Sequence, residues 1–156
     1  FMMKRSLGLL LLLVTSMDVC HAQNSESARK IAENAAAQWN AAFAGGRVED
    51  ILSLYADNAL LLQPNGAVAK GSGQIRDFWQ KLIGQGDYAM DLVDVRSQQD
   101  GTIVATVRFS DLKTLPNGGL HSMKYRYGGR VYSVLKQQPD GRWKAAVQRW
   151  GDDRNT

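Results

Sequence analysis

The sequence predicts an α+β fold in which three N-terminal helices pack on a curved antiparallel sheet. Apolar residues recur at helical spacing up to about residue 83, as in Ile75, Phe78, Trp79 and Leu82. From residue 88 the pattern changes to the alternation of period two that is typical of half-buried strands. Turn pairs such as Asp100-Gly101 separate the alternating segments. Helices followed by strands favour helices gathered on one face of a sheet, with a hollow between the two layers.

Glycines divide the helical part. We expect the first helix to begin at Ser25 or Ser27 and to end near Ala44, because Gly45-Gly46 leaves helical backbone space at little cost. A second helix is expected from about Val48, where acidic residues in the first turn interact favourably with the helix dipole. Its buried stripe is predicted to contain Ile51, Leu52, Leu54 and Tyr55. A third helix is expected over about Ser72 to Ile83.

The predicted strands lie between turn signals. The first is Ala59 to Gln63, which Pro64-Asn65-Gly66 closes. Tyr88 to Gln98 and Thr102 to Phe109 form a hairpin, and Asp111 to Ser122 is a loop or a long hairpin. Lys124 to Gln138 is a long strand with a bend or bulge at Gly128-Gly129, and Arg142 to Trp150 returns antiparallel.

The first 22 residues have the pattern of a secretory signal peptide. Lys4-Arg5 precedes the apolar run Leu7 to Val14, and cleavage is expected after Ala22. The run is too short for a transmembrane helix. Lipid attachment at Cys20 is the alternative, although Asp18-Val19 fits poorly where small residues are required. Residues 23–156 are therefore expected to form one periplasmic or secreted domain without stable membrane association.

Composition argues against several classes of function. The net charge of +4 includes basic residues of the leader, and no block of like charge or aromatic-basic surface predicts nucleic-acid binding. After cleavage the chain has no cysteine and a single histidine, His121. No metal-ligand spacing, phosphate loop or nucleophile motif occurs, so we predict no metal, no cofactor and no catalytic residue.

Two runs, AAFAGGRVEDILSLYADNALLLQPNG and GSGQIRDFWQKL, resemble the N-terminal half of the nuclear transport factor 2-like superfamily. The likeness is strongest to its SnoaL-like and ketosteroid-isomerase-like branches, and GRWKAAVQRWGDD resembles the last strand of small SnoaL-like domains. The resemblance covers roughly residues 27–152 and implies the cone-shaped α+β fold of that superfamily. Since this fold hosts isomerases, cyclases, dehydratases, binding proteins and assembly modules, it does not select a function.

The resemblance also implies three catalytic positions. Ketosteroid isomerases use a carboxylate base before the proline of the first strand, with a tyrosine and a protonated aspartate that hold the enolate oxygen. This chain has Gln63, Trp39 and Ser133 at those places. Because glutamine cannot accept a proton at neutral pH, steroid-type isomerisation is not expected.

Strand alternation, oriented by the resemblance, directs Ala146, Gln148 and Trp150 into the hollow. Gln63 is expected beside Tyr55 and opposite Gln148. The candidate ligand-binding residues are Trp39, Tyr55, Leu61, Gln63, Phe78, Phe109, Ser133, Leu135, Gln148 and Trp150, with Val107 and Val131 nearby. An apolar wall with few polar groups is typical of a pocket for a small apolar or amphipathic molecule, and also of a filled core.

Three functions remain open at this point. The first is a ligand-binding domain without a catalytic set. The second is an isomerase, cyclase or dehydratase in which Tyr55, Gln63 and Gln148 polarise a carbonyl while His121 approaches from its loop. The third is an assembly module that dimerises through the outer sheet face, where Trp143, Ala145 and Val147 are expected.

Overall fold

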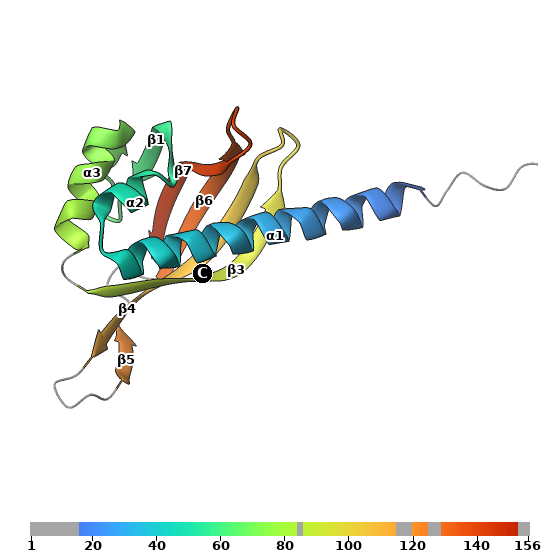
Figure 1. Cartoon of the computed structure of the whole chain (residues 1–156). Helices are drawn as coiled ribbons and strands as arrows, with labels where there is room; N and C mark the ends of the chain where they lie inside the picture. Colours follow the sequence, from blue (N-terminus) through green and yellow to red (C-terminus); the bar gives the residue numbers. More distant parts are fainter. Residues whose placement is uncertain (1–15, 84–85, 115–119, 125–128, 153–156) are drawn as a thin grey trace, which may run out of the picture.

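The computed structural model describes the backbone of residues 16–83, 86–114, 120–124 and 129–152, and the side chains of residues 25–83, 86–110 and 129–151. In this part of the chain, helices pack on one face of a curved sheet (Figure 1), which confirms the predicted α+β fold. The helices are α1 (Ser16–Gly45), α2 (Val48–Leu52) and α3 (Gly71–Leu82). The strands are β1 (Tyr55–Leu62), β2 (Val68–Lys70), β3 (Asp87–Ser97), β4 (Ile103–Thr114), β5 (Leu120–Lys124), β6 (Gly129–Gln137) and β7 (Trp143–Asp152).

The sheet is mixed rather than purely antiparallel. Its strand order is β2-β1-β7-β6-β4-β3, and β5 pairs with β4 beside this path. β1 and β7 are parallel neighbours, whereas the other pairs are antiparallel. The first long strand and the last strand therefore lie side by side in the middle of the sheet.

Helix α1 begins earlier than predicted, at Ser16, and passes through the expected cleavage point after Ala22. Residues 1–15, with most of the expected signal peptide, lie outside the described residues. Cleavage stays a prediction that N-terminal sequencing of the exported protein would test. The predicted end of the helix is confirmed, because Gly46 has a φ of 67° and its N–H bonds to the Ala42 carbonyl at 3.2 Å.

The predicted stripe of α2 was wrong at Tyr55. The helix ends at Leu52, and Tyr55 begins β1 instead. The Leu54 carbonyl accepts a hydrogen bond from the N–H of Ala145 at 2.9 Å, so pairing with β7 has already begun there. The short strand β2 was not predicted; it follows a turn in which the Gln63 N–H bonds to the Ala67 carbonyl at 2.8 Å.

Two predicted segments end differently in the structure. The strand after Thr102 continues as β4 to Thr114 and pairs with β5, so the hairpin alternative for this region holds in the described residues. The predicted strand from Lys124 is divided, because Lys124 belongs to β5 and β6 begins at Gly129. The expected bend at Gly128-Gly129 falls partly on residues 125–128, which lie outside the described part.

A β-bulge at Ala146 reverses the predicted alternation of β7. Val134 pairs with Val147 while Leu135 pairs with Ala145, so Ala146 is the extra residue. Ala145 is fully buried and Ala146 is only half-buried. The prediction that Ala146 points inward and Ala145 outward was wrong, since one extra residue exchanges the faces of everything before it. Trp143, which was also predicted to point outward, packs against the core. Of the three residues predicted on the outer face, Val147 lies there.

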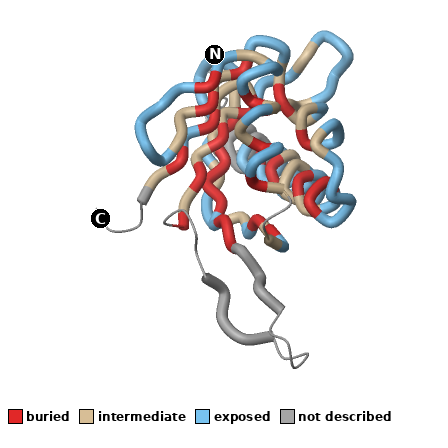
Figure 2. The backbone as a smooth tube through the Cα atoms, turned by 90° about the vertical axis from the view of Figure 1, so that its left-hand side faces the viewer, coloured by how far each residue is buried: buried red, intermediate tan, exposed pale blue. Residues whose placement is uncertain are grey.

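The core lies between the helices and the concave face of the sheet. Figure 2 shows the buried segments along the strands and on the adjoining sides of the helices. In α3 the buried residues are Ile75, Trp79 and Leu82, which confirms the helical spacing inferred from the sequence.

Candidate functional site

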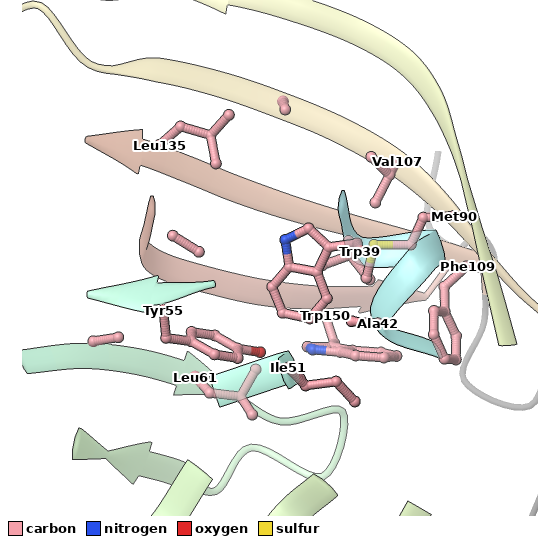
Figure 3. Packing of buried hydrophobic residues seen from close by; sticks show 14 of the residues in the cluster. Trp39, Ala42, Ile51, Tyr55, Leu61, Met90, Val107, Phe109, Leu135 and Trp150 are labelled. Carbon is pink, nitrogen blue, oxygen red and sulfur yellow. The ribbon is translucent and has the colours of Figure 1, made fainter. Parts of the chain in front are cut away.

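An aromatic cluster fills the space where the sequence predicted a hollow. Trp79 of α3 is at its centre, and its ring centroid lies 5.3 to 6.4 Å from those of Trp39, Phe43, Phe78, Phe109 and Trp150. Figure 3 labels Trp39, Phe109 and Trp150 of this cluster, which come from α1, β4 and β7, together with Tyr55 of β1, whose ring centroid lies 5.1 Å from that of Trp39. Tilted and edge-to-face pairs of this kind each contribute about 0.5–1.5 kcal/mol beyond the burial of their area. The layers are therefore held together by aromatic side chains.

A chain of hydrogen bonds crosses this cluster. The indole Nε1–H of Trp79 donates to the hydroxyl of Tyr55 at 3.0 Å, and that hydroxyl donates to Oε1 of Gln148. The residues come from α3, β1 and β7 and are all buried. Burial raises the pKa of Tyr55, and the hydrogen bond from Trp79 opposes this only in part. The phenol therefore stays protonated and acts as a donor.

The side-chain amide of Gln148 is only half satisfied. The residue is 0% exposed, and its Nε2 has no hydrogen-bond acceptor among the described residues. An indole, a phenol and a primary amide together carry more N–H and O–H donors than acceptors. Turning the amide over would leave the Tyr55 proton without its acceptor, so the orientation with Oε1 on the hydroxyl satisfies more of the network. In that orientation a group that completes the hydrogen bonding of Nε2 has to be an acceptor.

The structure brings most of the predicted site residues together. Eight of the ten are buried, namely Trp39, Tyr55, Leu61, Phe109, Ser133, Leu135, Gln148 and Trp150. Ser133 of β6 pairs in register with Gln148, which places a hydroxyl-bearing residue beside the amide. Phe78 is half-buried, with its ring centroid 5.3 Å from that of Trp79 and 5.7 Å from that of Trp150.

Gln63 does not have its predicted position. It lies one residue beyond β1 and is half-buried, and its backbone closes the turn to β2. Leu61, rather than Gln63, is opposite Gln148 in the parallel pair. The expected association of Gln63 with Tyr55 and Gln148 is replaced by a direct bond between those two residues.

Sequence reasoning placed Trp79 in the core but missed its part in the site. Among the buried residues Ile75, Trp79 and Leu82, it has the largest side chain and the only side-chain N–H group, and this could have identified it. Phe43 was also missed, although it follows Trp39 by one helical turn. The backbone of His121 lies in β5, and its side chain lies outside the described residues.

Two further findings concern the described part of the chain alone. It contains no group of three His, Cys, Asp or Glu side chains that could hold a metal ion. None of the helices in that part is long and apolar enough to cross a membrane.

Residues 36–146 match the sequence profile of the SnoaL-like domain. A ketosteroid isomerase-like protein from Erwinia carotovora atroseptica has a TM-score of 0.60 and 16% identity, covering 77% of this chain and 92% of that one. A protein of unknown function from Mycobacterium tuberculosis has a TM-score of 0.67 and 16% identity, over 89% and 78% of the two chains. A putative dehydratase of the NTF2-like family from Streptomyces avermitilis has a TM-score of 0.59 and 18% identity, over 80% and 95%. A search of the curated proteins gives no match. At these identities the solved structures establish a common fold.

Proposed function

Since this chain belongs to the SnoaL-like domain family, we propose that it is an exported binding domain for a small, largely apolar molecule that carries one neutral hydrogen-bond acceptor. The observation that carries the proposal is the fully buried amide of Gln148, whose Nε2 lacks an acceptor in the described structure. A buried donor without a partner costs about 1–3 kcal/mol, and a ligand group that accepts from it recovers part of that cost, because the ligand acceptor loses its own hydration on binding.

The acceptor is expected to be neutral, such as a ketone or ester carbonyl. The buried polar side chains of the described residues are Thr106, Ser110, Ser133 and Gln148, and none of them is cationic. A carboxylate would therefore lose its hydration without gaining a counter-charge, which is strongly unfavourable in an apolar surrounding. A carbonyl oxygen avoids this cost and can accept from Nε2.

Entry of a ligand requires a side chain to move, because the cluster is filled in this structure. Phe78 is suited to that movement, since it is half-buried at the edge of the cluster and contacts both Trp79 and Trp150. Rotation of this ring would expose the two tryptophans, one of which lies two residues along β7 from Gln148. A boundary that opens by the rotation of one ring favours a compact ligand of one or two rings.

The same geometry supports binding in preference to proton transfer. The phenol of Tyr55 has a raised pKa and already donates its proton to Gln148, so it does not act as a base near neutral pH. An amide and an indole do not titrate. The network can therefore orient and polarise a carbonyl, as a binding site requires.

A matched pair of ligands tests this proposal. Indan-1-one and indane have nearly the same shape, but only the ketone has an acceptor. We expect the protein to bind indan-1-one about threefold to tenfold more tightly, because a neutral hydrogen bond contributes about 0.5–1.5 kcal/mol. Calorimetric titration of both compounds measures this preference, and tryptophan fluorescence checks that the aromatic cluster is involved.

Gln148→Met keeps the length of the side chain and removes the amide, so it should abolish the preference for the ketone. Gln99→Met changes an exposed glutamine in the turn between β3 and β4 and should leave the preference intact. Equal affinity for the two compounds in the unmodified protein would refute the proposal, as would an unchanged preference in Gln148→Met. Near-ultraviolet circular dichroism shows whether each variant keeps its aromatic packing.

A further inference from the structure

A second concave feature lies outside the aromatic cluster. It is an open groove of about 470 Å³ between the middle of α1 and the turn from β6 to β7 (elements in Figure 1). Its lining consists of Ile31, Asn34, Ala35 and Gln38 from α1, Ser53 and Leu54 from the chain before β1, and Gly141, Arg142, Trp143 and Lys144. The volume is in the range of about 300–1,000 Å³ that is usual for small-molecule sites.

One part of the groove is apolar. Ile31 and Ala35 are one helical turn apart and therefore share a face of α1. Together with Leu54 and Trp143 they are partly buried and pack on the core below. These four side chains form an apolar surface that is partly in contact with solvent. An alkyl chain on this surface gains up to about 0.8 kcal/mol for each methylene group, and less where the open groove leaves the chain exposed.

Another part of the groove is positively charged. Arg142 and Lys144 contribute to the lining, and no aspartate or glutamate does. Asp140 is near in sequence, and its Oδ1 accepts the backbone N–H of Arg142 at 3.0 Å, which holds this carboxylate in the turn. The groove therefore offers cationic groups to an anion at the end formed by the turn from β6 to β7.

We propose that this groove binds a free, single-chain amphipathic anion, such as a fatty-acid carboxylate. The alkyl chain lies on Ile31, Ala35, Leu54 and Trp143, and the head group lies beside Arg142 and Lys144. This site is separate from the interior one in position and in charge. The interior network requires a neutral acceptor, whereas the groove requires an anion with an apolar tail.

Titration with octanoate, decanoate and dodecanoate below their micelle concentrations tests the site. Each extension by two methylene groups should tighten binding several-fold to about tenfold, because the longer chain covers more of the apolar surface. The emission of Trp143 should change on binding, and the change should be absent in Trp143→Phe. An affinity that does not depend on chain length would overturn the proposal.

The double variant Arg142→Gln/Lys144→Gln tests the charge. Decanoate should bind it about threefold to tenfold more weakly, the range expected for exposed ion pairs, while decan-1-ol should bind both proteins equally. Arg108→Gln removes an exposed arginine from the outer face of β4 and should leave decanoate affinity unchanged. Unchanged decanoate affinity in the double variant would contradict the assignment of the head group.

Two further measurements distinguish binding in the groove from binding in the interior or at a membrane surface. Gln148→Met should bind decanoate as the unmodified protein does, so failure of the interior site and failure of the groove are distinguishable. Loss of decanoate binding in Gln148→Met would show that the anion binds in the interior, and it would overturn the groove site. Binding to phosphatidylglycerol vesicles without any binding of free decanoate would replace the proposed ligand by a membrane surface and would also overturn it.

Discussion

The side chain of Asn40 makes the backbone hydrogen bonds to β3 that a neighbouring strand would otherwise make. β3 is the last strand in the sheet order, and Met90 directs its backbone N–H and C=O away from β4. The side chain of Asn40 satisfies both groups, because Nδ2 donates to the Met90 carbonyl at 2.9 Å and Oδ1 accepts the Met90 N–H at 2.7 Å. One amide on α1 thus joins the helix to the edge of the sheet and occupies the Met90 groups that another chain could otherwise pair with.

Asn40→Ala should lower the free energy of unfolding by about 2 kcal/mol. Two partly buried backbone groups lose their partners, at about 1–3 kcal/mol for each fully buried group, and the better helix propensity of alanine offsets about half a kcal/mol. Urea denaturation at neutral pH measures the change. Asn34→Ala carries the same propensity gain at an exposed position of α1 and is expected to be neutral or slightly stabilising. Equal stabilities for the two variants would show that the Met90 bonds contribute nothing.

At the level of elements, an ion pair joins α2 to α3. Nη2 of Arg76 donates to Oε2 of Glu49 at 3.2 Å, and Nη1 of the same guanidinium contacts Oε1. The hydrogen bond from Arg76 holds the pKa of Glu49 below its ordinary value of 4.5. Glu49 also lies in the first turn of α2, where a negative charge interacts favourably with the helix dipole.

The stability difference between the protein and Glu49→Gln should depend on pH. A carboxyl whose pKa is lowered by folding stabilises the folded state above its unfolded pKa, and this contribution is lost as the pH falls through the folded pKa. The difference should therefore be present at pH 6 and should disappear in acid below the ordinary value of 4.5. Urea midpoints across this range, at low and high salt, measure it, and high salt should reduce it because both side chains are exposed.

Asp50→Asn is the matched control, because it removes a carboxylate from the same turn of α2 without removing the partner of Arg76. If Glu49→Gln and Asp50→Asn change stability alike at every pH, the contact with Arg76 makes no separate contribution.

The sequence predicted the position of an element correctly where residues close together in the chain determine it. The end of α1 at Gly46 depends on local backbone conformation, and the buried face of α3 depends on the spacing of its apolar residues. Both can therefore be predicted from the sequence pattern. The bulge at Ala146 could not be predicted in this way. Ala145, Ala146 and Val147 are all apolar, so the sequence does not show which of them is the extra residue. Tyr55 was assigned to a helix because Ile51 and Leu52 precede it by four and three residues. Pairing with the distant strand β7 determines its conformation instead.

In the candidate site, too, the sequence predicted which side chains are buried but not which of them bond to each other. Resemblance and alternation predicted that Tyr55, Gln148 and Trp150 face the interior, and the structure buries all three. The bond between Tyr55 and Gln148 joins residues 93 positions apart, and the bond from Trp79 depends on how α3 lies across the sheet. Periodicity predicts which side of an element is buried, but it does not predict which polar groups meet there.

The described helices lie on one side of the sheet and leave its outer face uncovered (Figure 1). Leu60, Val147, Val134 and Val104 form a row in register across β1, β7, β6 and β4, and each is half-buried. Arg108 and Arg149 are exposed on the same face, while Asp91 and Asp94 are exposed on β3 at its side. Apolar residues with both signs of charge favour a surface that is complementary to a copy of itself, as a two-fold interface requires, and we propose that this face mediates self-association.

We therefore expect a homodimer through this face at micromolar concentration, and Val134→Lys should convert it to a monomer. A lysine in the middle of the apolar row would meet its own copy near the two-fold axis, where both charges lose water and repel each other. Val68→Lys is the matched control, since Val68 is an exposed valine on β2, outside the row. Sedimentation velocity of the three proteins, with circular dichroism to confirm folding, distinguishes the outcomes. A protein that sediments as a monomer before any substitution, or a Val134→Lys variant that remains dimeric, would show that the outer face does not mediate self-association.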